Sequence, residues 1–520
     1  MTQVNKIDSN VTGLRFSEEA SIGVVAGSPV WIPLEPNSYS DFGGNVTTVA
    51  RNPINSGRQR KKGVVTDLDA SGGFEQDWTQ TNLQTILQGF FFADFREKGS
   101  EVVTAVDVDT SNPDEYEVAS TTGFLVGSLI KGSGFTNAAN NAVNAVTAIV
   151  ADTSVEVADG ALVAEAGPPA DATITVVGNK ATTGDLAVVV SGDFPAISSS
   201  TLDFTTLGLV PGEWIYVGGD ASNSTFFNAV NNGFKRVRSV AANLLTFDKS
   251  DSAMVTDDGT IDGAAGTGQQ IELYFGRVLK NETGSSIVRR TYQLERTLGA
   301  PDDASPSQIQ SEYLVGAVAN ELTINIPQAD KMTASLGFIA IDHEQRTGAT
   351  GVKSGTRPTL AESDAFNTSS DFGRIRIALV DTTTEAPTPL FAFLTELNLV
   401  INNNVSPNKA VATLGAFDVT AGTFAVSGSM TAYFSNVTAV SAVRNNSDVT
   451  LDYILAKDNV GIAVDLPLIA LGEGRANVEQ DQPITLPVSY DAATGSAVLS
   501  TMDHTLLMVF FDYLPTAAAA

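Results

Sequence analysis

Regular alternation of apolar and polar residues over long segments is the feature that most constrains how this chain can fold. Four segments show it, at 321–326, 332–338, 396–402 and 424–434. The apolar positions are Leu322, Ile324, Ile326, Met332, Ala334, Leu336, Phe338, Leu397, Leu399, Ile401, Phe424, Val426, Met430 and Phe434. The polar positions between them are Glu321, Thr323, Asn325, Thr333, Ser335, Glu396, Asn398, Asn402, Ser427, Ser429 and Thr431.

Successive side chains of a β-strand point to opposite faces, so each segment predicts a long strand with one dry face and one solvated face. The turn-like segment Pro327-Gln328-Ala329-Asp330 separates the first two strands and predicts a hairpin. Abundant Gly, Thr, Val, Asn and Ser agree with short strands joined by turns. The chain is therefore expected to be all-β.

One segment departs from this pattern. Its apolar residues recur at helical spacing, which predicts a helix capped by Asp77 or Thr79 and ending before Phe95. These residues are Trp78, Leu83, Ile86, Leu87, Phe90 and Phe91. The wide apolar stripe requires the helix to pack on the flank of a sheet.

Residues 101–275 are richer in small, polar and turn-forming residues, and they contain an internal repeat. GFLVGSLIKGSGFTNAANN begins at Gly123, and GLVPGEWIYVGGDASNSTFFNAVNN begins at Gly208; both end in Asn-Ala-x-Asn-Asn. The repeat predicts two related small β domains in tandem, although chance similarity between two Gly- and Asn-rich segments is an alternative. We expect them to occupy 101–180 and 181–275, inserted into one larger β domain formed by 1–100 and 276–520.

The residue inventory argues against most kinds of catalytic and metal site. Cysteine is absent, and the two histidines, His343 and His504, lie far apart in the chain. Disulfides, thiolate ligands and cysteine nucleophiles are thereby excluded, and a zinc site or a histidine-based triad is not expected. The chain contains no GxxxxGK[ST], GxSxG or HExxH motif. We predict no catalytic residue, no cofactor and no metal.

Two acidic pairs, Asp257-Asp258 and Asp302-Asp303, lie in turn-like sequence. The segment DDGTIDG from Asp257 resembles a calcium-binding loop, but it lacks the glutamate that closes an EF-hand. Solvated turns explain both pairs better than a bound cation does.

The formal net charge of −29 excludes DNA binding through phosphate neutralisation, which requires clustered Lys and Arg. The charge fits either simple solubility or a surface that DNA passes without sticking. The basic cluster Arg58, Arg60, Lys61 and Lys62 is isolated and has no interleaved aromatic residues. It is either an ordinary solvated loop or a contact to an acidic neighbouring copy.

No apolar run approaches the ~20 residues of a membrane-spanning helix. The polar N-terminus, Thr2 to Asn10, lacks the basic-then-apolar pattern of a signal peptide. We therefore expect the chain to fold in a cytosol and to have no membrane partner.

Three blocks of the chain resemble the tail tube, or major tail, proteins of bacteriophages with long non-contractile tails. The first runs from LRFSEEASIGVVAGSPVWIPLEPNSYSDFGG at Leu14 to the segment RNPINSGRQRKKGVVTDLDASGGFEQDWTQTNLQTILQGFF at Arg51. The others are RRTYQLERTL from Arg289 and TELNLVINNNVSPNKAVATLGAFDVTAGTFAVSGSMTAYF from Thr395. These blocks cover about half of the chain and consist of structural residues; residues 101–275 depart from the compact members.

The resemblance implies a β-sandwich with one flanking α-helix, whose copies form rings, usually of six, with a shared inner β-barrel. The rings stack helically through a long loop, which makes Arg51, Arg58, Arg60, Lys61 and Lys62 candidate inter-ring contacts. The inserted domains resemble the β domains that decorate the exterior of such tubes. The resemblance also implies a virion protein assembled in the host cytoplasm, with tape measure, tail terminator and distal tail proteins as partners.

A bore wide enough for duplex DNA needs more strands than one such domain supplies, so several copies must contribute strands. The solvated faces of the four alternating strands are candidates for the lumen wall, through Glu321, Thr323, Asn325, Thr333, Ser335, Glu396, Asn398, Ser427, Ser429 and Thr431. This set contains no Lys or Arg, so genome DNA would pass without specific binding. Ordinary exterior sheet surface is the alternative.

Two other functions remain open on the sequence alone. An acidic, cysteine-free β protein rich in Thr also fits a capsid decoration or S-layer-like protein. The aromatic residues Trp214, Tyr216, Phe226 and Phe227 could form a sugar-binding platform of a carbohydrate-binding module or a glycan-degrading enzyme, or the core of a small domain.

Overall fold

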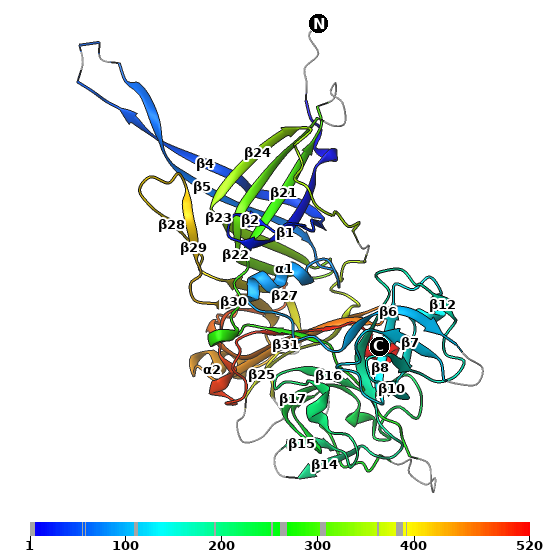
Figure 1. Ribbon diagram of the computed structural model, residues 1–520. Helices are drawn as coiled ribbons and strands as arrows, with labels where there is room; N and C mark the ends of the chain where they lie inside the picture. The colour runs from blue at the N-terminus through cyan, green and yellow to red at the C-terminus, as the bar shows by residue number, and fades with distance from the viewer. Residues whose placement is uncertain are drawn as a thin grey trace.

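The structure is a computed structural model. It describes residues 6–54, 56–57, 59–108, 113–191, 194–250, 253–259, 268–301, 308–360, 363–380, 388–391 and 393–519. Across these residues the chain is mostly β, as the alternation predicts, and its strands form two large antiparallel sheets. Figure 1 shows an elongated molecule in which one sheet runs from the top to the lower left and the other packs beside its lower end.

The larger sheet, here called the main sheet, contains 18 strands drawn from both ends of the chain. They are β1 (Gly13–Ser21), β2 (Val24–Val25), β3 (Ile32–Leu34), β4 (Pro36–Arg51), β5 (Lys61–Asp77), β20 (Arg277–Lys280), β21 (Tyr292–Gly299), β22 (Ile309–Ile326), β23 (Thr333–Ala340), β24 (Asp342–Gly348), β25 (Phe372–Leu379), β26 (Thr388–Pro389), β27 (Leu394–Asn402), β30 (Ala425–Tyr433), β31 (Val449–Lys457), β32 (Val460–Glu473), β33 (Thr485–Ala493) and β34 (Leu507–Phe511).

The second sheet, here called the insertion sheet, contains 14 strands, all from the middle of the chain. They are β6 (Ser100–Asp107), β7 (Glu115–Val118), β8 (Ser128–Ser133), β9 (Val143–Ala145), β10 (Ala148–Val150), β11 (Ser154–Glu156), β12 (Glu165–Ala166), β13 (Thr173–Lys180), β14 (Ala187–Ser191), β15 (Phe194–Ser198), β16 (Trp214–Val217), β17 (Gly233–Ala241), β18 (Leu244–Ser250) and β19 (Glu272–Tyr274). The strands β28 (Ser406–Lys409) and β29 (Ala416–Thr420) form a separate hairpin.

Helical segments are few in the described residues. The α-helices are α1 (Gln84–Phe91) and α2 (Thr438–Arg444). Short 3-10 turns are η1 (Ser9–Val11), η2 (Ala138–Asn141), η3 (Phe204–Leu207), η4 (Ala229–Asn231), η5 (Gly284–Ser286), η6 (Gly495–Ala497) and η7 (Thr516–Ala519). None of the helices in this part of the chain is long and apolar enough to span a membrane.

The predicted hairpin is confirmed. β22 and β23 pair in an antiparallel ladder in which Asn325 lies opposite Thr333 and Leu322 opposite Leu336. On its other side β22 pairs with β27, which in turn pairs with β30. The four alternating segments are therefore neighbours in one sheet, in the order β23-β22-β27-β30.

The predicted helix exists, but it begins later than expected and its predicted caps are wrong. α1 starts at Gln84, its N-cap residue is Leu83, and no side chain caps it. Asp77 is the last residue of β5, while Thr79 and Asn82 exchange side-chain-to-backbone hydrogen bonds in the turn before the helix. The short helix α2 was not predicted, since its seven residues give too brief an apolar pattern.

The main core lies between α1 and the dry faces of the alternating strands. Ile86, Leu87 and Phe90 of α1 are fully buried, and Phe90 packs edge-on against Phe338 of β23. Because the helix covers the apolar face of this sheet, the opposite face is left for solvent or for another molecule.

The insertion leaves and rejoins the main sheet at one point. Arg96 and Val278 form a β-bridge through backbone hydrogen bonds of 2.8 and 3.2 Å. A long insertion whose ends meet in this way adds little strain to its host.

The insertion also packs on the main sheet through a buried interface. Strands β16–β18 lie against β31, β32 and β34, with Trp214 and Phe234 in the same apolar cluster as Phe511. Beside this cluster, Asp465 of β32 binds Arg236 at 2.8 Å and Lys249 at 2.9 Å. All three charged side chains are nearly or fully buried, so the contact is specific in orientation.

Candidate functional site

The ten candidate lumen residues lie on one face of the main sheet. They project from β22, β23, β27 and β30, opposite the apolar residues that form the core, and all are exposed or half-buried. Cross-strand neighbours include Thr323 with Ser335 and Asn398 with Ser429. The structure thus brings residues 321–335 and 396–431 together into a continuous surface, here called the polar face.

Hydrogen bonds between neighbouring strands order this face. Thr431 donates its hydroxyl to Glu396 at 2.7 Å, and the amide nitrogen of Ser429 donates to the side-chain oxygen of Asn398 at 2.6 Å. The side chain of Asn402 donates to Glu321 at 3.3 Å. The carboxylates of Glu396 and Glu321 are therefore bound to neighbouring side chains of the polar face.

The polar face continues beyond the predicted residues at both sides. β5 adds Glu75 and Asp77 beside β23, and β33 adds Ser489 and Asp491 beside β30. The alternation of β5 is hidden in the sequence by Gly72 and Gly73, and that of β33 by Pro487. Both strands pair with partners that are distant in the sequence, so no local pattern places them beside β23 and β30.

The charged side chains of the polar face are acidic. Its described strand positions carry five carboxylates and no Lys or Arg; the five are Glu75, Asp77, Glu321, Glu396 and Asp491. The nearest cation is Lys331 in the β22–β23 turn, whose ammonium binds Asp77 at 2.8 Å. The face is an acidic, hydroxyl-rich and amide-rich wall.

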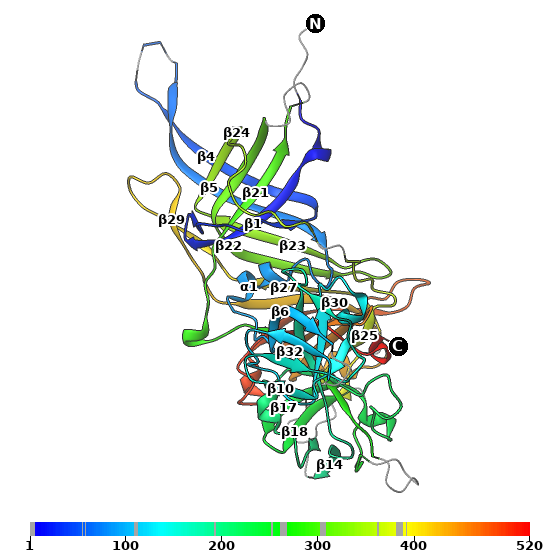
Figure 2. The ribbon, with the colours of Figure 1, turned by 45° about the vertical axis from the view of Figure 1, so that its right-hand side comes forward.

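The basic cluster lies on a long arm. β4 and β5 form a hairpin that projects far beyond the rest of the main sheet (Figures 1 and 2). Arg51, Arg60, Lys61 and Lys62 are exposed near its tip; Arg58 lies outside the described residues. Arg51 stands directly opposite Lys61 in the ladder, and like charges in that position repel each other.

The arm also exposes apolar side chains. Val46, Val49, Val64 and Val65 are each about half exposed, and Ile54 at the tip is fully exposed. Isolated apolar residues on a surface are ordinary, but a cluster on a projecting hairpin marks a contact surface. Cations that repel each other and uncovered valines together fit an arm that binds another molecule.

A second, shorter arm lies below the first in Figure 1. It consists of β28, β29 and their connection, and it exposes Val411, Leu414 and Phe417. Lys409, the last residue of β28, binds Asp67 and Asp69 of the first arm, each at 2.5 Å. The two arms are thus fastened together.

The two halves of the insertion share one hydrogen-bond arrangement. Glu165 accepts bonds from the backbone and side chain of Asn137 and from the side chain of Asn140. In the second half the same bonds run from Asn228 and Asn231 to Asp257. The Asn-rich ends of the two repeats therefore act as matching structural clasps.

This arrangement gives the acidic segment at Asp257 a structural role. Asp257 is buried and saturated by Asn228, Asn231 and the amide of Gly259. The rest of the predicted calcium-like loop, from 260, and the pair Asp302-Asp303 lie outside the described residues. Within the described ranges, no group of three or more His, Asp or Glu side chains has the spacing of a metal site.

The suggested aromatic platform is not present as a surface. Trp214, Tyr216 and Phe226 are buried in the core of the insertion or against the main sheet, and only Phe227 of the four is exposed. A sugar platform requires several rings open to solvent.

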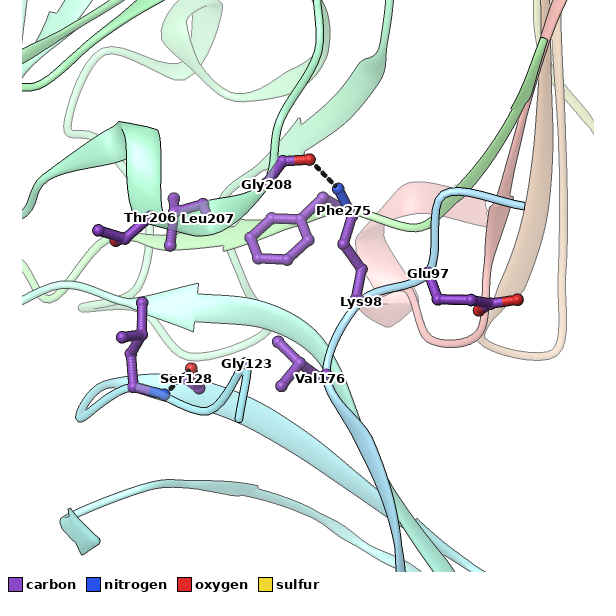
Figure 3. A pocket seen from close by; sticks show the side chains of 11 residues that line it. Glu97, Lys98, Gly123, Ser128, Val176, Thr206, Leu207, Gly208 and Phe275 are labelled. Atoms are coloured by element: carbon purple, nitrogen blue, oxygen red, sulfur yellow. Dashed lines mark hydrogen bonds between the residues drawn. The ribbon is translucent and has the colours of Figure 1, made fainter. Parts of the chain in front are cut away.

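A small cavity lies between the halves of the insertion, shown in Figure 3. Its buried cation, Lys98, donates to the carbonyl of Gly208 at 2.9 Å and lies 3.1 Å from Glu213. Burial raises the pKa of Glu213, and the ammonium of Lys98 opposes that shift. The ion pair is used internally to join the two halves.

Comparison with known proteins points in one direction. The family model described as phage tail tube protein matches residues 9–492, which is nearly the whole chain and includes the insertion. No curated protein matches the sequence. The matched range contains both arms and every residue of the polar face.

Proposed function

This chain belongs to the phage tail tube protein family, and we propose that its copies join edge to edge into closed rings that stack helically into the tail tube. The family is structural, so the chain is a virion component rather than an enzyme. In this proposal the tube belongs to a long non-contractile tail and is the conduit through which genome DNA leaves the particle. Assembly takes place in the host cytoplasm.

The continuous polar face is the observation that supports this function best. Its strands run side by side and are backed by the apolar core, so the sheet can serve as one sector of a barrel wall. A bore for duplex DNA needs more strands than one chain holds. Ring closure supplies them, and it also removes sheet edges that would otherwise invite uncontrolled pairing.

The chemistry of the polar face suits passage of DNA. Every Lys or Arg that touched a phosphate would release counterions and add attraction, and this would be repeated at each ring of the tube. Glu321, Glu396 and the neighbouring hydroxyls hold water and mobile cations at the wall instead. We therefore assign the ten polar-face residues 321, 323, 325, 333, 335, 396, 398, 427, 429 and 431 to the lumen.

Stacking of rings is assigned to the β4–β5 arm. Its exposed valines supply apolar area, and Arg51, Arg60, Lys61 and Lys62 supply positive charge on a chain whose net charge is −29. An acidic surface of the next ring is the partner that this arm fits. Arg58 is included in this set from the sequence.

The insertion is assigned to the exterior of the tube. We propose two related inserted domains at 101–180 and 181–275 in a tube body formed by 1–100 and 276–520. Their matching Asn clasps and shared pairing support a common origin. None of the polar-face residues comes from the insertion, so it can lie outside without altering the bore.

The family resemblance extends the proposal to partners. A tape measure protein inside the growing tube, a tail terminator and distal tail proteins at its ends are the expected contacts, together with other copies of the chain. The resemblance implies six tube domains per ring, which means six chains if each chain supplies one.

Electron microscopy of the purified protein, and of tails from the virus that encodes it, tests the function. Hollow tubes or rings in both preparations, with the protein as the main tail component, are the expected result. Flat lattices would support an S-layer-like role, and capsid-bound copies a decoration role. A monomer absent from virions would remove the proposal.

A further inference from the structure

The main sheet contains one pairing scheme twice. A first unit, made of β1–β5, α1 and β21–β24, is repeated by a second unit, made of β25–β34 and α2. The matching antiparallel pairs are β1–β21 with β25–β31, β21–β22 with β31–β32, β22–β23 with β32–β33, β22–β24 with β32–β34, β5–β23 with β30–β33, and β4–β5 with β27–β30. The helices match as well, because α1 contacts β22 and α2 contacts β32.

The repeat holds at single residues. β23 begins at Thr333, opposite the last residue of β5, Asp77. β33 begins at Thr485, opposite the last residue of β30, Tyr433. Farther along, Tyr490 of β33 occupies the place of Phe338 of β23 in the core. Apolar character is retained in the second unit while residue identity is not.

The two units are joined by strand pairing. β22 of the first unit pairs with β27 of the second over residues 321–326 and 397–402, with Asn325 opposite Asn398. β27 is the second unit's counterpart of β4. The chain itself therefore shows how β22 of one unit pairs with the β4-like strand of the following unit.

The second unit has the equivalent strand edge, but among the described residues no strand pairs with it. Residues 474–478 continue from β32 and stand where 322–326 stand in the first unit, since Asn477 bridges Thr485 as Asn325 pairs with Thr333. Val478 is 71% exposed, whereas Ile326, which lies opposite Leu397 of β27 and belongs to the main core, is 6% exposed. Among the described residues no strand pairs with the outer side of this segment.

The complementary edge lies at the opposite end of the sheet. β4 pairs with β5, and among the described residues its other side has no strand partner. Ser40 of β4 lies opposite Gly73, as Asn398 of β27 lies opposite Ser429. Gly73 lies opposite Gly337 of β23, and Ser429 lies opposite Ser489 of β33. Because Gly337 and Ser489 occupy equivalent positions in the two units, Ser40 is the counterpart of Asn398.

We propose that β4 of one copy pairs with residues 474–478 of the next copy, in the way that β27 pairs with β22 inside the chain. Ser40 of one copy then lies opposite Asn477 of its neighbour. Unpaired backbone N–H and C=O groups on both edges supply the hydrogen bonds, and the neighbour covers Val478. The polar face then continues from copy to copy, with Arg475 at the place that Thr323 has in the first unit.

The count of chains in a ring follows, if the proposed tube function holds. Each chain contributes two tube units and so fills two sectors of the wall. The six sectors that the family resemblance implies are therefore filled by three chains. The ring would have exact threefold symmetry and only approximate sixfold symmetry.

Cysteine cross-linking tests the pairing directly, because the chain has no cysteine of its own. Opposed residues on antiparallel strands have Cα atoms about 4.5–5.5 Å apart, within the range that a disulfide bridges. Assembled Ser40→Cys/Asn477→Cys protein, oxidised and run on a non-reducing denaturing gel, should give bands of two and three linked chains and none larger.

Matched variants interpret the gel. Asn325→Cys/Asn398→Cys should cross-link within single chains and so reports that oxidation works. Val46→Cys/Asn477→Cys, with one cysteine moved up the arm, should give no linked chains. The proposed pairing is wrong if the 325–398 disulfide forms in its variant while assembled rings or tubes of the 40/477 variant form no disulfide between chains. A ladder that reaches six chains would overturn the three-chain ring.

If the double variant does not assemble, the rotational symmetry of unsubstituted rings in cryo-electron microscopy decides. Threefold symmetry supports the inference, and six whole chains per ring overturn it. The tube function fails on a different result, namely that the unsubstituted protein forms no ring or tube and is absent from tails.

Discussion

Arg236 of the insertion and Asp465 of the main sheet form a buried ion pair, with 2.8 Å between a guanidinium nitrogen and a carboxylate oxygen. Burial would raise the pKa of Asp465, but Arg236 and Lys249 outweigh it and lower that pKa to about 2. The carboxylate is therefore charged at neutral pH and also accepts a bond from the indole of Trp214 at 3.2 Å. The insertion is held at a fixed position on the main sheet.

Removing one member of this pair should be costly. Asp465→Asn removes the carboxylate that Arg236 and Lys249 share in a buried site, where only Asp248 and Asp452 remain beside them. We expect a loss of about 3–5 kcal/mol of unfolding free energy. Urea unfolding followed by tryptophan fluorescence measures it. Asp418→Asn, which breaks a partly exposed pair with Arg289, should cost less than about 1 kcal/mol. Equal losses in the two variants would contradict a special role for the buried pair.

Acid should weaken the fold through His504. Burial lowers the pKa of this side chain to about 4, with Asp465 opposing the shift, whereas in the unfolded chain the pKa is near 6.5. The unfolded state therefore binds the proton first, and stability is lost as pH falls from 6.5 to 4, by about 3 kcal/mol. Urea unfolding at several pH values should show this slope. His504→Leu should flatten it and His343→Gln should not; an unchanged slope in His504→Leu would refute the assignment.

Positive charge on the polar face should sharply reduce DNA delivery. Glu396→Lys/Ser429→Lys places two cations on the polar face, and attraction to phosphates would then recur at every ring. Tubes should still form in electron micrographs, while infectivity and DNA ejection fall sharply. The control Glu396→Gln/Ser429→Thr changes the same positions without adding cations and should behave nearly as the unsubstituted protein does. Full infectivity of the lysine variant would show that this face is not the lumen.

Reversing the charge of the first arm should separate rings. Arg51→Glu/Lys61→Glu/Lys62→Glu removes the proposed attraction to an acidic neighbour, so single rings should accumulate in place of tubes. Salt should also shorten unsubstituted tubes, because it screens exposed charges. Arg444→Glu reverses an exposed charge on α2 and should leave tube length unchanged. Normal tubes in the triple variant would rule out the arm cations as stacking contacts.

The polar face was largely readable in the sequence because alternation is a local property. The ten residues between Glu321 and Thr431 lie at the alternate, solvent-facing positions of four strands, and no distant residue can change which positions share a face. Glu75 was missed because the glycines beside it interrupt the alternation. What local patterning could not supply was strand order, which places Asn398 next to Asn325 rather than on a distant sheet.

Other features depended on contacts between remote segments. Arg236 and Asp465 come together only when the insertion docks on β32. The repeat of the pairing scheme in the main sheet is not visible in the sequence, because core positions such as Phe338 and Tyr490 keep size and apolarity but not identity. The sequence places the helix start too early because Trp78 fits a helical stripe, although its backbone hydrogen-bonds instead to Met332, just before β23, and to Phe366.

The central claim is that many copies enclose a water-lined bore with the polar face turned inward. A cryo-electron microscopy map of assembled tails, at a resolution that shows side chains, tests it most directly. We predict a hollow tube whose inner wall is formed by β23, β22, β27 and β30, with Glu321 and Glu396 facing the axis. An inner wall built from other strands, or one lined with Lys and Arg, would contradict the account.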